Sequence, residues 1–274
     1  MLRLNELKLP LDHALEDLPR AICARLGITP DALESYTIAK RGNDARKKSA
    51  IKLVYAVDVV VKNEAAVLAA FVGDPQLRPT PDTGYRFVTQ APANYNGPRP
   101  VVIGAGPCGI LAALVLAQMG FRPIIIERGK AVRERTKDTW GLWRRAVLNP
   151  ESNAQFGEGG AGTFSDGKLY SRIKDPRHLG RKVLVEFVKA GAPEEILTET
   201  HPHIGTFRLV TMGMSSRGTI EALGGEYRFQ TRVDDFDIST AADGSRSMRG
   251  LHLSNGEYLP AEHVIMAVGH SARD

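Results

Sequence analysis

The sequence predicts a mixed α/β protein in which a small α+β domain precedes a larger domain built around a parallel sheet. Its 274 residues fit about two domains. Proline and glycine are dense over 73–98, which neither a long helix nor a central strand tolerates, so this segment is a predicted linker. Apolar strands alternate with helical patterns after it, which favours a parallel sheet. We therefore expect domains over 1–72 and 99–274.

The composition is that of an ordinary globular protein. Apolar residues make up 43% and charged residues 24% of the chain, which excludes disorder and fibres. A net charge of +5 is too small to indicate a nucleic-acid partner. Cys23 and Cys108 form no CxxC pair, so neither disulfides nor a metal site are expected. No stretch approaches the roughly 20 apolar residues of a membrane span. We expect a soluble, cytoplasmic protein.

The first domain is predicted to run in the order β-α-β-β-α. A polar turn is expected over 41–44, with basic residues at 40–41 and 46–48 on its flanks. Solvation is the expected state of these basic residues, and a phosphate-rich partner is the alternative. The elements are an extended segment over 2–9, a helix carrying Leu15, Leu18, Ile22 and Leu26, strands over 35–40 and 51–61, and a short helix over 64–71.

The strongest local signal is a glycine fingerprint, VVIGAGPCG, over 101–109. An apolar helix over 110–119 and a second apolar strand over 124–126 follow it, and that strand ends on Glu127. A lone GxGxxG is weak, but here the strand, helix, second strand and acid are all in register. This context predicts a Rossmann-type dinucleotide site; a glycine turn in an ordinary βαβ unit is the alternative.

Each glycine of the fingerprint has a separate expected role. Gly104 permits the tight turn, Gly106 lets backbone amides approach a pyrophosphate, and Gly109 lets the helix pack closely on the sheet. The phosphates then lie at the positive end of the helix. Pro107 and Cys108 fill the variable positions; Cys108 is expected to be a small packing residue, with a redox thiol as the alternative.

Glu127 and Arg128 follow the second strand of this unit. A carboxylate at the position of Glu127 accepts hydrogen bonds from the hydroxyls of an adenosine ribose. It also repels a ribose 2′-phosphate, so NADP is disfavoured at this site despite the neighbouring Arg128.

A second glycine cluster, FGEGGAGT, occupies 156–163. Small residues such as Gly159 and Gly160 let a backbone lie against a flat ligand and offer amides to it. A flexible surface loop is the alternative. Trp140 and Trp143 precede this cluster on a predicted helix, and we expect them to pack in a core or an interface.

Hairpin dipeptides mark the C-terminal region, Asp243-Gly244 and Asn255-Gly256. They predict a β-meander inserted in the doubly wound domain, followed by an apolar returning strand over 263–267. The expected strands before it cover 227–231, 233–238, 248–253 and 258–259.

Several of these motifs together resemble a known family. They are GAGPCG, the Glu127-Arg128 pair, residues 148–153 leading into QFGEGGAGTFSDGKLYSRIKD, and HPHIG at 201–205. This combination is similar to uncharacterised FAD-dependent dehydrogenases related to the glutathione-reductase type of flavoprotein. The resemblance covers essentially the whole chain, including 44–48 of the first domain.

The resemblance implies FAD in the Rossmann site, with NAD(P)H as a candidate electron donor. It puts the fingerprint and Glu127 on the ADP half and the second glycine cluster near the pyrophosphate or isoalloxazine. It also implies that a strand following Gly224-Gly225 contacts adenine and that the returning strand leads back to the cofactor. The residues assigned to the cofactor are Gly104, Gly106, Pro107, Gly109, Glu127, Arg128, Gly159, Gly160, Val233 and Gly269.

Two features depart from the family pattern. A helix is expected over 209–224, but Gly213 and Gly218 interrupt it at a cost of about 1 kcal/mol each, so it should be weak or broken. Such flavoproteins also continue past the position of Asp274, so we expect the C-terminal part of the fold to be missing and the chain alone to have little or no turnover.

The leading hypothesis is a FAD-binding oxidoreductase that uses hydride transfer by the flavin. A nucleotide-binding module without turnover and an NAD-dependent dehydrogenase are the alternatives. The sequence identifies neither the small-molecule substrate, nor catalytic residues, nor the oligomeric state.

Overall fold

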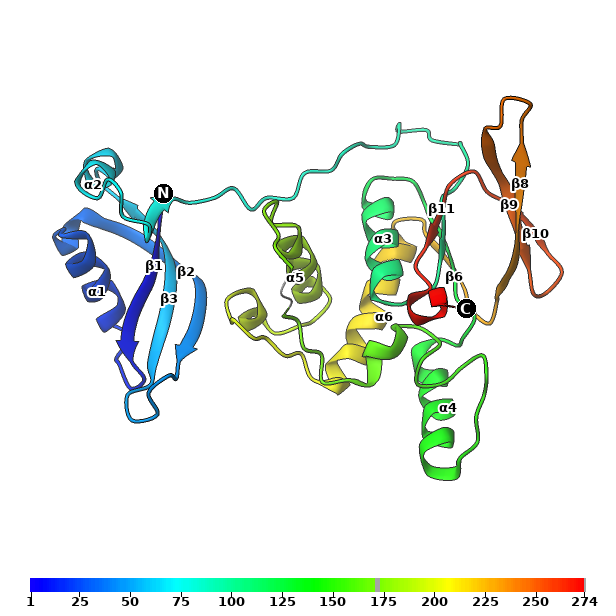
Figure 1. The fold of residues 1–274 in the computed structure, drawn as a ribbon, viewed down its shortest axis with the longest axis horizontal. Helices are drawn as coiled ribbons and strands as arrows, with labels where there is room; N and C mark the ends of the chain where they lie inside the picture. Colours follow the sequence, from blue (N-terminus) through cyan, green and yellow to red (C-terminus); the bar gives the residue numbers. More distant parts are fainter. Residues whose placement is uncertain (171–172, 274) are drawn as a thin grey trace. The chain divides into compact units, whose positions relative to one another are not determined.

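The computed structural model of the chain describes residues 1–170 and 173–273 (Figure 1). Within them the chain divides into two compact units, each made of segments distant in sequence. Unit 1 comprises Met1–Tyr85, Lys168–Val185 and Pro193–His203, and unit 2 comprises Arg86–Gly167, Glu186–Ala192 and Ile204–Asp274.

Unit 1 is built on an antiparallel sheet of order β2-β3-β1-β4. Over its first part the strands and α-helices follow one another in the order β-α-β-β-α. Its elements are β1 (Leu2–Pro10), α1 (Asp17–Leu26), η1 (Pro30–Ala32), β2 (Leu33–Asp44), β3 (Lys52–Val61), α2 (Glu64–Ala70), β4 (Leu77–Pro79) and η3 (Glu194–Leu197). The helix α5 (Leu179–Lys189) runs across the sequence boundary between the two units.

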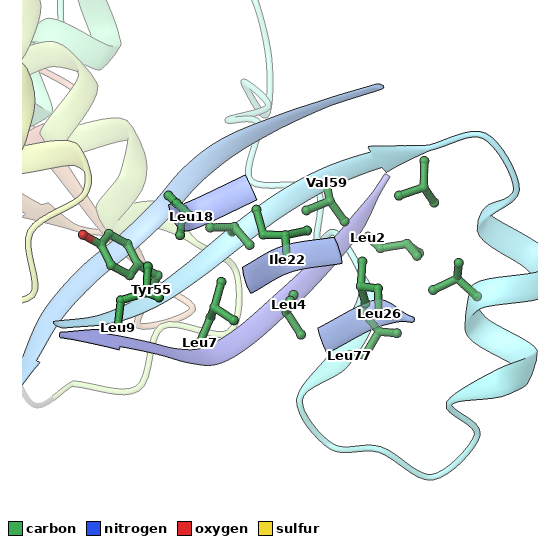
Figure 2. Packing of buried hydrophobic residues seen from close by; sticks show 13 residues of the cluster. Leu2, Leu4, Leu7, Leu9, Leu18, Ile22, Leu26, Tyr55, Val59 and Leu77 are labelled. Atoms are coloured by element: carbon green, nitrogen blue, oxygen red, sulfur yellow. The ribbon is translucent and has the colours of Figure 1, made fainter. Parts of the chain in front are cut away.

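The core of unit 1 forms between the sheet and α1, where Ile22 packs against leucines of β1 and valines of β3 (Figure 2). Alternate residues of β1 are buried, but the alternation changes phase between Leu4 and Leu7. A register shift at this point, with Glu6 at a φ of 56°, allows the leucines on both sides of it to face the same core.

Two expectations for unit 1 were wrong in detail. β4 is a strand inside the segment predicted as a linker, and it pairs with β1. The polar residues 41–44, predicted as a turn, continue β2 instead. The Arg41 N–H donates to Thr198 O (2.7 Å) and the Thr200 N–H donates to Arg41 O (2.9 Å). The pairing of β2 with β3 continues through these residues to Asp44 opposite Lys52, and the bonds of Arg41 to a distant segment add to it.

Unit 2 contains a parallel sheet of order β11-β5-β6-β7 and, between β7 and β11 in the chain, an antiparallel sheet of order β10-β9-β8. Its elements are β5 (Val101–Ile103), α3 (Pro107–Gln118), β6 (Ile124–Ile126), α4 (Val132–Arg145), η2 (Gly160–Phe164), α6 (Thr206–Ala222), β7 (Glu226–Arg228), β8 (Val233–Thr240), β9 (Arg246–Leu253), β10 (Tyr258–Pro260), β11 (Val264–Met266) and η4 (Gly269–Arg273).

The parallel sheet of unit 2 is covered on both faces, which explains the short, apolar strands β5, β6 and β11; β7, at one edge, carries the polar sequence EYR. Val101 and Ile103 face the antiparallel sheet and pack with Leu251. Val102, between them, faces the other way and packs with Ile220 of α6 and residues of α3. The unit therefore has three layers, and the turns at the carboxyl ends of β5 and β6 lie at the edge of the middle layer. None of the described helices combines the length and apolar character needed to cross a membrane.

The expectation of a weak or broken helix before Gly224 was wrong, because α6 is continuous over 17 residues. Gly213 and Gly218 lie inside it, and no described atom would come within 4 Å of a Cβ at either position. Met212 and Ile220 of the same helix are buried. Burying two such side chains stabilises the helix by several kcal/mol, which offsets the two glycines at about 1 kcal/mol each.

Substituting Gly218→Ala is expected to raise the free energy of unfolding by about 0.5–1 kcal/mol, because alanine favours the helix and the added methyl group meets no neighbour. Urea unfolding measures this change. The matched control is Gly225→Ala, whose Cβ would lie 2.4 Å from Ile220 Cγ2 and which should destabilise the protein. A loss of stability in the Gly218 variant would contradict the account of α6.

Candidate functional site

The glycine fingerprint forms the turn between β5 and α3, and the fold itself requires two of its glycines. A Cβ on Gly104 would lie 2.5 Å from Ala267 O, and one on Gly109 would lie 1.8 Å from Gly104 O. Gly104 also has a φ of 100°, a conformation that favours glycine. The absence of side chains at these two glycines lets the turn pack directly against the residue after β11 and the start of α3.

Gly106 differs from the other two glycines. Its backbone is extended, with φ −76° and ψ −179°, which any residue adopts. Among the described residues beyond its chain neighbours, a Cβ there would meet only Gly160 Cα, at 3.9 Å. Pro107 follows at the first position of α3, where its missing N–H costs nothing. The fold does not need a glycine at 106, so the absent side chain leaves room for something else.

Glu127 follows β6 and is buried. Its Oε2 accepts a hydrogen bond from the Ala105 N–H (2.8 Å), and its Oε1 accepts from the N–H groups of Gly129 (2.8 Å) and Gly157 (3.0 Å). A carboxylate has about four acceptor positions, so three are used inside the chain. Glu127 therefore ties the fingerprint turn to the second glycine cluster, a role that the sequence did not indicate.

The second glycine cluster packs directly on the fingerprint turn. The Gly159 N–H donates to Ala105 O (2.7 Å). A Cβ on Gly160 would lie 3.1 Å from Gly106 Cα, and one on Gly129 would lie 2.5 Å from Gly157 Cα. The close approach of these backbones explains the small residues of the cluster and brings Gly159 and Gly160 beside the predicted phosphate site.

Arg135 of α4 holds this cluster in place, and sequence reasoning missed it. The side chain is fully buried, and burial lowers its pKa to about 10, so it stays charged at neutral pH. All its hydrogen bonds go to the segment that carries the glycines. The acceptors are Asn153 O (2.8 Å), Ala154 O (2.9 Å), Gly157 O (3.3 Å), Glu158 O (2.7 Å) and Thr163 Oγ1 (3.3 Å).

Glu158 continues this buried network. Its Oε2 accepts a hydrogen bond from the Val132 N–H at the start of α4 (2.8 Å), and Arg217 Nη1 of α6 lies 3.2 Å from the same oxygen. Its Oε1 has no hydrogen-bond partner among the described residues. Burial raises the pKa of Glu158. Charges of alternating sign therefore lie beneath the glycine cluster and link it to two helices.

A polar cavity of about 330 Å³ lies on the Arg128 side of the site. Glu151 bridges the two arginines of the lining: Arg128 Nε donates to Glu151 Oε2 (2.7 Å), and Arg232 Nη1 donates to Glu151 Oε1 (2.8 Å). The Arg128 hydrogen bond, with the charges of both arginines, lowers the pKa of Glu151. The lining residues are Arg128, Lys130, Asn149, Glu151, Ser152, Gln230, Arg232 and Ser254.

The structure gathers most of the residues that the sequence assigned to the cofactor. The three fingerprint glycines, Glu127 and the Gly159–Gly160 pair surround one turn, and Arg128 faces the cavity beside it. Val233 begins β8, and the segment before it follows the end of β6, with the Thr231 N–H donating to Glu127 O (3.0 Å). Gly269 begins η4 shortly after β11.

Trp140 and Trp143 do not belong to a core, so of the two expected settings, core or interface, the structure excludes the core. They are 44% and 54% exposed on α4, with ring centroids 5.8 Å apart, and Trp143 also contacts Phe164 (5.7 Å). Cys108 is exposed at the start of α3, and its thiol is free.

Comparisons with known proteins identify one family model that matches part of the chain and several related proteins. The model of a family described as a domain of unknown function, DUF8436, matches residues 1–60. An uncharacterized protein of Clostridium beijerinckii is 40% identical over 278 residues, which cover 100% of this chain and 49% of that protein. The chain thus spans about half the length of this relative.

The dual trans-enoyl reductase/FAD-dependent monooxygenase tazHJ of Aspergillus terreus is 28% identical over 180 residues, 59% of this chain and 25% of that protein. Among solved structures, the crystal structure of THI4 from Thermovibrio ammonificans is similar with a TM-score of 0.42 and 18% identity, over 64% of this chain and 58% of that chain.

Replacing Arg135 by Met is expected to lower the free energy of unfolding by about 3–5 kcal/mol, because four carbonyl oxygens lose a donor and the buried carboxylates lose a cation. Hydrogen exchange should show lost protection over 153–160. Arg133→Met, on the exposed face of the same helix, is the control. Equal stability of the two variants would refute this role for Arg135.

Glu158 should make stability depend on pH with a defined sign. Its pKa is raised above the ordinary value of 4.5 in the folded chain, so the folded chain binds this proton more tightly than the unfolded chain. The resulting stability is fully present below the unfolded pKa and is lost as the pH rises through the folded pKa. The difference in unfolding free energy between the wild type and Glu158→Gln should therefore fall as the pH rises above the ordinary carboxyl pKa of 4.5. A constant or rising difference would contradict the prediction.

Proposed function

We propose that the chain binds FAD and belongs to an oxidoreductase that uses it. The observation that carries this proposal is Gly106, where the chain leaves out a side chain that its own packing would admit. A dinucleotide site needs this space, since the backbone there must approach the pyrophosphate. The similarity to a protein named as a FAD-dependent monooxygenase supports FAD over other dinucleotides.

The surrounding residues fit the parts of such a cofactor. The N-terminus of α3, at Gly106 and Pro107, offers a positive dipole end to the pyrophosphate. Gly159 and Gly160 give backbone access from the other side of the turn. Glu127 retains about one acceptor position for a ribose hydroxyl after its three internal hydrogen bonds.

The adenosine end is proposed to extend towards the cavity lined by Arg128 and Gln230, near Val233. Gly269, after β11, is proposed to border the cofactor from the far side of Gly104. Bound FAD would supply hydride transfer. The chain's residues would bind and orient the cofactor, and NAD(P)H is the proposed electron donor.

The direct test is to purify the chain, record its visible absorbance and identify any nucleotide released on denaturation. Thermal unfolding with added FAD or NAD then compares the two cofactors. Released FAD, or stabilisation by FAD, supports the proposal. Stabilisation by NAD alone, with NAD the nucleotide released, would replace it by a nicotinamide-dependent dehydrogenase.

The substitution Gly106→Val separates binding from folding. Gly106 is the N-cap of α3, where valine is less favourable than glycine, so the free energy of unfolding should fall by about 1 kcal/mol, too little to unfold the chain. The valine side chain would occupy the pyrophosphate space, so FAD affinity should fall at least about tenfold. Fluorescence titration with FAD measures the affinity, and Gly218→Ala is the control outside the site. Unchanged FAD affinity in a folded variant would exclude Gly106 from the site.

A further inference from the structure

The cavity beside Arg128 is lined by more positive charge than an unphosphorylated ribose needs. Arg128 directly follows Glu127, the proposed ribose residue, and an arginine in this neighbourhood accommodates the 2′-phosphate in NADP-binding sites. Lys130 and Arg232 line the same cavity. Three cations in a cavity next to a ribose site would favour a phosphorylated ribose.

Each of these cations already faces a carboxylate of the chain. Glu151 accepts from Arg128 (2.7 Å) and from Arg232 (2.8 Å), one on each of its oxygens. Arg232 Nε also donates to Asp234 (2.7 Å), and Lys130 Nζ lies 2.9 Å from Asp138. Glu151 is the carboxylate that joins the two arginines, and it lines the cavity itself.

The side chain of Asn149 fixes the backbone of Glu151 in this position. The side-chain oxygen of Asn149 accepts hydrogen bonds from the N–H groups of Glu151 (3.0 Å) and Ser152 (3.2 Å), which closes a tight turn. The guanidinium of Arg128 also lies 4.1 Å from the centre of the Phe156 ring. Both members of the Arg128–Glu151 pair are therefore held by contacts of their own.

We propose that Glu151 adds to the cofactor specificity expected from Glu127: it occupies the two guanidinium groups as an internal anion and rejects a ribose 2′-phosphate. A 2′-phosphate would have to displace Glu151 or lie beside its negative charge, and both cost free energy. The site thereby selects adenosine dinucleotides with a free 2′-hydroxyl, such as FAD. This inference rests on the proposed function, because it requires an adenosine ribose at Glu127.

The structure also indicates that Glu151 can be changed without unfolding the chain. Its side chain is 39% exposed and that of Arg128 is 29% exposed. Ion pairs at such exposure contribute little to stability. Substituting Glu151→Gln keeps the shape, removes the charge and leaves Arg128 available to a phosphate.

The experiment compares ADP-ribose with 2′-phospho-ADP-ribose, two probes that differ only in the 2′-phosphate, by calorimetric titration of the full chain. The wild type should prefer ADP-ribose. In Glu151→Gln the ratio of the two dissociation constants should move towards the phosphorylated probe by about tenfold, the value of one charge-assisted hydrogen bond. The shift should shrink at high salt.

Glu257→Gln is the matched control, since Glu257 is an exposed carboxylate that accepts from Arg228 (2.7 Å) away from the cavity lining. Its ratio should equal that of the wild type. Glu151→Ala should shift the ratio in the same direction as Glu151→Gln.

The outcomes separate the two proposals. A wild type that binds ADP-ribose but shows the same ratio in Glu151→Gln, or an equal shift in the control, overturns the role of Glu151 alone. A folded wild type that binds neither ADP-ribose nor FAD overturns the proposed function and, with it, this inference.

Discussion

Three backbone amides converge on the carboxylate of Glu127, and the geometry of the site depends on that convergence. The amides belong to Ala105 in the fingerprint turn, to Gly129 after β6 and to Gly157 in the second glycine cluster. A buried carboxylate is stable only when hydrogen bonds replace its water, and bonds to a charged acceptor are short and strong. One side chain therefore positions three separate segments, the fingerprint turn, the end of β6 and the second glycine cluster.

Burying Glu127 creates a need for positive charge, which Arg135 supplies. The negative charges of Glu127 and Glu158 both raise the pKa of Arg135, against the larger effect of burial. Arg217 in turn lies against Glu158. Such a network is costly when incomplete, because a buried charge without its partner pays the full desolvation penalty. The apolar layers on both faces of the parallel sheet support this polar layer at the sheet edge.

The glycines and arginines of the site look alike in sequence but differ in what they do. Gly104 and Gly109 are required by backbone contacts inside the fold, whereas a Cβ at Gly106 would meet only Gly160 Cα, at 3.9 Å, among the described residues. Arg135 is fully buried and organises the backbone, whereas Arg128 lines a cavity and is neutralised by Glu151. These roles can be told apart only from the tertiary contacts of each residue.

The sequence by itself determined the elements whose signals are local: the strand–turn–helix at the fingerprint, the apolar strands and the hairpin turns, since periodicity and turn residues act over a few neighbours. The tertiary structure decided the rest. The continuation of β2 through Arg41 depends on its pairing with β3, which runs as far as Asp44 opposite Lys52, with added backbone bonds to Thr198 and Thr200. The continuity of α6 depends on burial that outweighs its glycines. The partners of Arg135 and Glu151 likewise lie in other segments, because a charged side chain is assigned its role by the groups that the fold brings within hydrogen-bond distance.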